Sequence, residues 1–206
     1  MHFDRPLHVP RSPGARRIEA WSPRLKRRLT LYSRAAYELW VSIEADPDVR
    51  VFCERPARLA GPNGSEVAEF WVRKDRRDEF LLLGAPAARE PERFVLLEDE
   101  RAVRVRRVVP ADLLAARTWV LNWQQILPYL AANLRFATPA LLAEVKAALA
   151  SPRSLMALER RCRHQDAMIV RTALFALLHA GAVNAPSLHT TPLSLHTTFR
   201  RAAPTA

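Results

Sequence analysis

Apolar and polar positions follow two different periods in the first half of the chain. Between Ser33 and Ala45 the large side chains recur every three to four residues, which predicts an amphipathic helix with Ser33 as its N-cap. Val49–Glu54 and Glu66–Lys74 alternate instead, and this alternation predicts two strands. The tetrapeptide Gly61–Gly64 between them has the composition of a hairpin turn.

The pattern that follows predicts a crossover between parallel strands. Phe80–Leu83 is apolar throughout, as expected of a strand covered on both faces of a sheet. A helix with proline at its first turn is predicted over Glu92–Arg101, and Ala102–Val109 alternates valines with arginines as a further strand. A strand, a helix and a second strand form a βαβ unit, so the two strands should be parallel. Further helices are predicted from Pro110 and over Thr118–Ala132.

A helix, antiparallel strands and a βαβ unit, in that order, are typical of the restriction-endonuclease-like fold. The sequence therefore predicts an α/β domain over residues 31–137, with a mixed sheet flanked by helices.

Residues 138–206 are predicted to form a second, smaller domain. Thr138-Pro139 has the composition of a helix start, and a second helix is predicted over Arg153–Arg163. A third helix should end near Gly181, followed by two strand-like pieces around Thr190–Pro192. Three helices and a β-wing indicate a winged helix, a domain that binds DNA in some proteins and only other proteins in many.

Residues 1–30 are predicted to form a basic, extended arm. This stretch has several prolines and no hydrophobic periodicity, apart from Arg24–Leu29, which could form a basic helical turn.

The net charge of +11 is concentrated at the two ends of the chain. Residues 1–30 carry a surplus of +6 and residues 138–206 a surplus of +5, whereas residues 31–137 are neutral. A neutral body with basic ends favours contact with a phosphate backbone. The chain has 29 arginines and three lysines, so a GC-rich genome offers another explanation for the arginines. The predicted DNA-binding residues are Arg24, Lys26, Arg27, Arg28, Arg73, Lys74, Arg76 and Arg77.

Cysteine usage and hydropathy indicate a cytoplasmic protein without a membrane partner. Cys53 and Cys162 lie far apart in patterned segments, as buried thiols in a reducing compartment do. No apolar run approaches the ~20 residues needed to span a bilayer, and the N-terminus lacks the apolar core of a signal peptide.

Short motifs along residues 33–200 have a familiar order and spacing. They are Ala36-x-Glu38, Asp46–Val49 with Glu54–Pro56, Val67–Val72, Val108–Leu113, Asn122–Tyr129, Leu178–Val183 and Pro192–Thr198. In this order they resemble TnsA, the endonuclease subunit of heteromeric transposases. The resemblance implies cleavage at the 5′ ends of a mobile element, beside a separate transposase and under the control of an AAA ATPase regulator.

The resemblance also identifies where catalytic residues should lie. By position, Glu38 matches the family's helix glutamate and Glu69 matches its metal-binding aspartate. Such nucleases hold Mg²⁺ with two or three carboxylates and use a lysine to stabilise charge or position water. The third acid and the lysine should fall at Leu82 and Gly84, or at Leu83 and Ala85, and neither register restores them.

Three functions remain open at the level of sequence. The first is a TnsA-like subunit with a degenerate nuclease centre, needing no cofactor, which binds DNA at transposon ends and the transposase and ATPase partners. The second is an active Mg²⁺-dependent nuclease, in which Glu38 and Glu69 hold the metal and Arg73 replaces the lysine. The third is a winged-helix transcription regulator. Judged without the family, Glu38 fits a solvated residue, whereas Glu69 fits an ion pair to an arginine and a metal ligand equally well.

Overall fold

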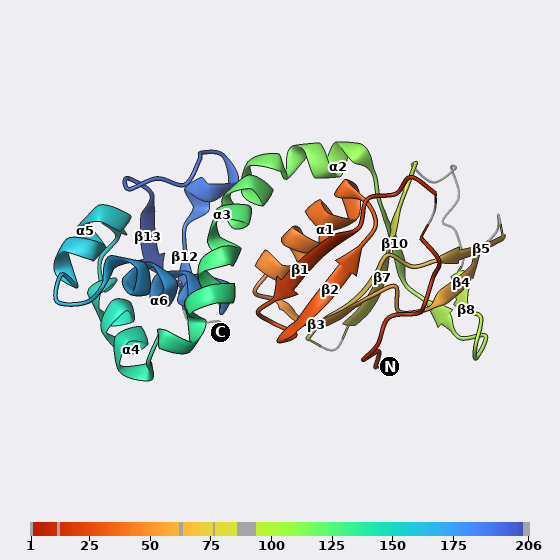
Figure 1. Ribbon diagram of the computed structural model, residues 1–206, viewed down its shortest axis with the longest axis horizontal. Coiled ribbons are helices and arrows are strands. Elements are labelled where there is room, and N and C mark those ends of the chain that lie inside the picture. The colour runs from red at the N-terminus through yellow and green to blue at the C-terminus, as the bar shows by residue number, and fades with distance from the viewer. Residues whose placement is uncertain (1, 12, 62–63, 76, 86–93, 204–206) are drawn as a thin grey trace. The chain divides into compact units, whose positions relative to one another are not determined.

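The computed structural model describes residues 2–11, 13–61, 64–75, 77–85 and 94–203 (Figure 1). They form two compact units, one of residues 1–43 and 48–115, the other of residues 44–47 and 116–206. The predicted boundary at residue 138 is therefore displaced. Helix α3 (Arg117–Asn133) belongs to the second unit, because its buried face, including Trp123 and Ile126, packs there with α6 (Ala167–His179).

The first unit is an α/β structure with a four-stranded mixed sheet in the order β10-β7-β6-β3. Its strands are β3 (Val49–Glu54), β6 (Phe70–Lys74), β7 (Arg77–Leu83) and β10 (Val105–Val108). The parallel pairing predicted for the third and fourth strands is confirmed by the β7–β10 register, whereas β3, β6 and β7 are antiparallel. Helix α1 (Arg34–Ala45) precedes the sheet and begins as predicted, with Ser33 Oγ accepting a hydrogen bond from the Ala36 amide.

The helix predicted over residues 92–101 is wrong. Phe94–Leu96 is strand β8, and residues 86–93 lie outside the described part of the chain. β8 joins a second antiparallel sheet in the order β5-β4-β8-β9, with β4 (Arg58–Gly61), β5 (Gly64–Val67) and β9 (Ala102–Val103). Burial alternates along β8, so Phe94 and Leu96 both reach the core, which an extended chain achieves within three residues.

The predicted hairpin at residues 61–64 is confirmed by the antiparallel β4–β5 pairing. Gly61 is required by its neighbour, because a Cβ atom there would clash with the Phe94 ring.

The strand predicted over Glu66–Lys74 is interrupted. β5 ends at Val67 and β6 begins at Phe70, so Glu69 lies between two sheets instead of within a strand. The crossing is fixed by backbone hydrogen bonds: the Glu69 amide donates to Leu81 O at 2.8 Å, and the Arg55 amide donates to Glu69 O at 2.9 Å. The strand predicted over 102–109 likewise divides into β9 and β10.

A continuous apolar core fills one face of the mixed sheet and reaches the second sheet. Its buried members are Cys53, Ala57, Leu59, Ala68, Trp71, Phe80, Leu82, Phe94 and Leu96. Both cysteines are free and buried, as predicted, and burial raises the pKa of the Cys53 thiol to about 12. Cys53 is therefore a packing residue and is not poised for reaction near neutral pH.

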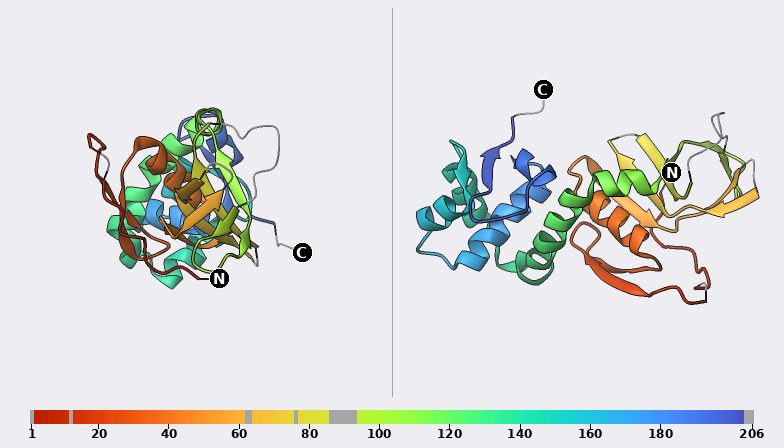
Figure 2. Two further views of the ribbon diagram at one scale, coloured as in Figure 1. Left: turned by 90° about the vertical axis from the view of Figure 1, so that its right-hand side faces the viewer. Right: turned by 90° about the horizontal axis from the view of Figure 1, so that it is seen from above.

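The extended arm predicted for residues 1–30 is wrong in its second half. Residues 18–31 form an antiparallel hairpin, β1 (Ile18–Ser22) and β2 (Arg27–Leu31), and the turn before β2 replaces the helical turn expected at 24–29. Leu29 and Leu31 are fully buried, so the hairpin belongs to the core. Figure 2 (right) shows it running alongside α1. Phe3 packs edge-on against Trp71 and Phe80, which attaches the start of the chain as well.

The second unit is mainly helical. After α3 and a short 3₁₀ turn η1 (Leu134–Phe136) come α4 (Pro139–Ala148), β11 (Arg153–Ser154), α5 (Leu155–Arg161), α6, β12 (Val183–Asn184), η2 (Pro186–His189) and β13 (Thr198–Arg201). The three strands pair in the order β11-β13-β12. Thr138, Ser154 and Asp166 cap helices α4, α5 and α6 through their side chains. Gly181 has φ +72°, as its predicted position at a helix end requires.

Helix α2 (Pro110–Ala115) ends the first unit and begins at the predicted proline. Within the described ranges, the longest and most apolar helices still fall short of what crossing a membrane requires.

Candidate functional site

Glu38 lies on a partly exposed side of α1. Its carboxylate accepts a hydrogen bond from Arg34 Nε at 2.7 Å, one helical turn earlier. Exposed pairs at this spacing contribute about 0.3–0.5 kcal/mol, because solvent screens them. This is the ordinary environment of a surface glutamate, and Glu38 needs no metal to account for it.

Glu69 has a different environment. Burial raises the pKa of its carboxyl, and the charge of nearby Arg55 opposes that effect without cancelling it. The Arg55 guanidinium is itself buried, where it donates to Thr30 O at 2.6 Å and lies 4.9 Å above the centre of the Tyr32 ring. The cation that Glu69 faces is therefore an arginine fixed by the hairpin β1–β2.

The residues at the expected third acid and lysine are apolar or lack a side chain. Leu82 is 2% exposed and belongs to the core cluster, so a carboxylate could not replace it without losing packing and being desolvated. Among the described residues, no group of three or more histidine, cysteine, aspartate or glutamate side chains could hold a metal ion.

An arginine that the sequence did not single out lies beside the missing lysine position. Arg107 Nη1 lies 3.4 Å from where a Cβ atom of Gly84 would stand. The Arg107 guanidinium forms two hydrogen bonds to the Glu66 carboxylate, at 3.1 and 3.2 Å. Arg107 can neutralise charge but cannot act as a base near neutral pH. Both of its Nη atoms already donate to Glu66. Arg107 is the register partner of Leu82 in the parallel β7–β10 pairing, and the sequence predicts that pairing but not its register.

Arg73, the residue considered as a substitute for the lysine, is also bound within the protein. Its guanidinium donates to both oxygens of Asp78, at 2.7 and 3.0 Å, and lies 5.0 Å above the Trp71 ring. The hydrogen bonds to Asp78 raise the pKa of Arg73, which keeps it protonated.

The predicted DNA-binding residues divide into two groups. Arg24, Arg27 and Arg73 make contacts within the first unit: Arg24 donates to Val49 O and Arg27 to Glu54. The exposed members are Lys26, Arg28, Lys74 and Arg77. Arg76 lies outside the described residues.

Arg27 is bound to a buried carboxylate. Its two Nη atoms donate to the two oxygens of Glu54 at 2.7 and 2.6 Å, and the hydrogen bond to Glu54 raises the pKa of Arg27. Glu54 is 1% exposed, and a buried carboxylate needs a counter-charge. The primary role of Arg27 is therefore to stabilise the fold.

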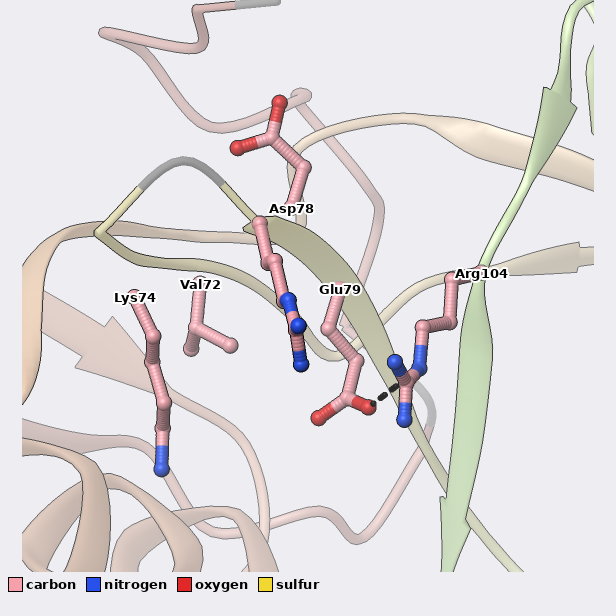
Figure 3. Close-up of a pocket in the computed structure, with 6 residues that line it drawn as sticks. Val72, Lys74, Asp78, Glu79 and Arg104 are labelled. Carbon is pink, nitrogen blue, oxygen red and sulfur yellow. Dashed lines mark ion pairs between the residues drawn. The ribbon is translucent and has the colours of Figure 1, made fainter.

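The exposed basic residues on β6 and β7 border a surface pocket of about 160 Å³ (Figure 3). Its lining residues are Val72, Lys74, Arg77, Asp78, Glu79 and Arg104. Arg104 precedes β10 and was not singled out from the sequence, since its neighbours in space lie more than 20 residues away along the chain.

Helix α6 of the second unit offers few groups that could contact DNA bases. Arg171 is its only arginine or lysine, and the Arg171 guanidinium is bound to Glu159 and to the Tyr129 hydroxyl. Most of the helix is buried, and its most exposed large side chain is Met168.

No protein-family model matches this chain, and a search of the curated proteins finds no significant match.

Proposed function

We propose that the protein is a TnsA-like subunit of a transposition complex, with a nuclease centre that no longer cuts DNA. The observation that carries the proposal is the replacement of the third acid and the lysine by the buried Leu82 and by Gly84. Catalysis of this type depends on charges placed around the phosphate and its metal. Here Arg107, which lies beside Gly84, is bound to Glu66, and Glu69 faces Arg55.

In this proposal the protein acts in the cytoplasm as a binding subunit for transposon ends and for the transposase and AAA ATPase partners. The first unit supplies the DNA contact, because exposed basic residues of the predicted set lie on its β1–β2 and β6–β7 hairpins. The second unit supplies a protein contact. Its helix α6 carries no exposed basic side chain with which to read bases. This argues against a stand-alone transcription regulator.

The first test is DNA cleavage. We expect the purified full chain, with Mg²⁺ or Mn²⁺ and with its partners, to leave transposon-end DNA uncut. The double variant Glu38→Ala with Glu69→Ala should then support transposition about as well as the wild type, since two carboxylates alone hold Mg²⁺ weakly. If the wild type makes 5′-end cuts that the double variant abolishes, the centre is active and the proposal is wrong.

A second prediction concerns the charge state of Glu69. Because burial raises its pKa, the protonated form favours the folded state. That stabilisation is complete below the ordinary pKa of 4.5 and is lost as the pH rises through the raised value. Glu69→Gln is neutral at every pH, so it should be more stable than the wild type at pH 7 and equal to it at low pH.

The measurement is thermal unfolding of the wild type and Glu69→Gln at pH 7 and at low pH, with and without Mg²⁺. Glu38→Gln is the matched control, because it changes a solvated carboxylate. A metal ligand would behave in the opposite way. Mg²⁺ would then stabilise the wild type, and Glu69→Gln would remove that stabilisation.

A further inference from the structure

Trp21 differs from the other four tryptophans of the chain, all of which lie in described ranges. It is 43% exposed, whereas Trp40, Trp71 and Trp123 are buried. Each of the other four, including the partly buried Trp119, packs against an aromatic ring. Among the described residues, no ring packs against the indole of Trp21. Its exposed surface is therefore available to a ring from outside the chain.

The register of the β1–β2 hairpin places Trp21 directly opposite Arg28. Both side chains are exposed, whereas the next pair along the hairpin, Ala20 with Leu29, directs Leu29 into the core. Directly opposed side chains of antiparallel strands have Cβ atoms roughly 4.5–5.5 Å apart. The indole and the guanidinium therefore leave the outer face of the hairpin at adjacent positions.

The exposed charges of this hairpin are mainly positive. Over residues 16–30 the exposed charged side chains are Arg16, Arg17, Glu19, Lys26 and Arg28. The carboxylate of Glu19 forms an ion pair with Arg17. Within the described ranges, neither Lys26 in the turn nor Arg28 has a carboxylate partner. Charged residues are depleted at the core of protein–protein interfaces, so these cations beside an exposed indole favour a polyanion as the ligand.

Contacts on the other face hold the hairpin in place. Leu29 and Leu31 are fully buried, and Arg27 is bound to Glu54. Figure 2 (right) shows the hairpin running alongside α1. A tryptophan side chain has few rotatable torsions, and a packed strand fixes its backbone, so Trp21 loses little conformational entropy when it binds a ligand.

We propose that the outer face of the β1–β2 hairpin binds single-stranded DNA, with an unpaired base stacked on Trp21 and phosphates beside Lys26 and Arg28. The proposal rests on the proposed DNA-binding function and specifies the form of the DNA. Aromatic side chains stack on unpaired bases, while basic side chains beside them follow the backbone. The bases of a duplex are stacked on one another and present only their edges in the grooves. The contact tolerates any sequence, because every base has a π-face.

The experiment measures the affinity of the full chain for an oligothymidylate of about 16 nucleotides and for a duplex of the same length. Trp21→Ala should weaken binding of the single strand roughly five- to fiftyfold and binding of the duplex less than about twofold, because only the single strand offers a free base face. Trp21→Phe should retain most of the affinity, since phenylalanine also stacks. Leu114→Ala is the matched control: it removes another exposed apolar side chain of the first unit and should change neither affinity.

Salt dependence and an abasic strand separate stacking from charge. Arg28→Ala should lower the salt slope for the single strand by about 0.7, as the loss of one phosphate contact does, whereas Trp21→Ala should leave it unchanged. A strand of abasic sugars keeps the phosphates and lacks the bases. The wild type should bind it as weakly as Trp21→Ala binds oligothymidylate, and Trp21→Ala should not distinguish the two strands.

Each outcome has one meaning. If the wild type binds oligothymidylate and the abasic strand equally well, the stacking site is wrong and the DNA-binding function stands. This comparison needs no variant, so it holds even if Trp21→Ala is unstable. If the wild type binds neither form of DNA, the proposed function fails and the single-strand assignment fails with it. Single-stranded RNA bound more tightly than DNA, with the same dependence on Trp21, would also overturn the DNA assignment.

Discussion

Replacing Arg27 with alanine is expected to lower the free energy of unfolding of the first unit by about 3 kcal/mol. The substitution leaves the carboxylate of Glu54 without the two hydrogen bonds that now neutralise it. Because Glu54 is buried, water cannot replace the guanidinium, and an uncompensated buried charge costs several kcal/mol. Arg27 is about one-third exposed, so the lower end of the usual range applies.

Chemical denaturation measured on Arg27→Ala and Arg28→Ala checks this prediction. Arg28 is the neighbour on the same strand, carries the same charge and is exposed, so its replacement should cost less than about 0.5 kcal/mol. Arg27→Met combined with Glu54→Leu should recover much of the lost stability, since no buried charge remains. Arg27 would instead be a DNA-binding residue if its replacement weakened DNA binding while leaving stability unchanged.

The Arg27–Glu54 pair also changes how the basic N-terminal region can be tested. Deleting residues 1–30 would remove Arg27 and the buried Leu29 together with any DNA contact, so the deletion would unfold the first unit. Single substitutions of the exposed Lys26 and Arg28 avoid this effect. Charge counting along the sequence identified a basic segment, but it could not separate the arginine that stabilises the fold from those that face solvent.

Local chemistry accounts for the features that the sequence predicted well. Ser33 caps α1, Thr138 caps α4, and Gly181 adopts positive φ at the end of α6, and each depends on residues within one or two turns. The parallel pairing of β7 with β10 is confirmed, although the helix over residues 92–101 from which it was predicted is wrong.

The features that were missed depend on partners distant in the sequence. Phe94–Leu96 fits a helical or an extended pattern equally well, and its pairing with β4, through Leu59 and Leu96, decides between them. Glu69 follows the alternation of a strand, but the chain changes sheets at that residue. Arg104 and Arg107 were not identified as site residues because their carboxylate partners lie 25 and 41 positions earlier, on other strands.

Replacing Asn122 with alanine is expected to destabilise the second unit by about 3 kcal/mol. The Asn122 amide is 1% exposed and makes three hydrogen bonds with main-chain atoms of η2 and of the segment that follows it. Its Nδ2 donates to Leu188 O at 2.7 Å and to Thr191 O at 2.8 Å, and its Oδ1 accepts from the Leu193 amide at 2.7 Å. Each buried main-chain group left without a partner costs roughly 1–3 kcal/mol, and partial access to water reduces the total.

The position of Asn122 explains why one side chain has so large an effect. It projects from α3 and holds a segment nearly 70 residues later in the chain, where few regular hydrogen bonds are available. The Trp119 ring of α3 also stacks on the His189 ring of η2, with ring centres 4.0 Å apart, which is a second contact between this segment and α3. The segment connects β12 to β13, so the loss of Asn122 should loosen the small sheet as well.

Hydrogen exchange at the Leu193 amide measures this effect directly, because that amide loses its acceptor in Asn122→Ala. Asn122→Asp nearly preserves the volume but places a carboxylate against two carbonyl oxygens, so it should destabilise the unit at least as much at neutral pH. Gln125→Ala, an exposed position on the same helix, is the matched control and should change stability by less than about 0.5 kcal/mol. Unchanged protection of Leu193 in Asn122→Ala would show that the segment is held by its own packing and that the three hydrogen bonds are dispensable.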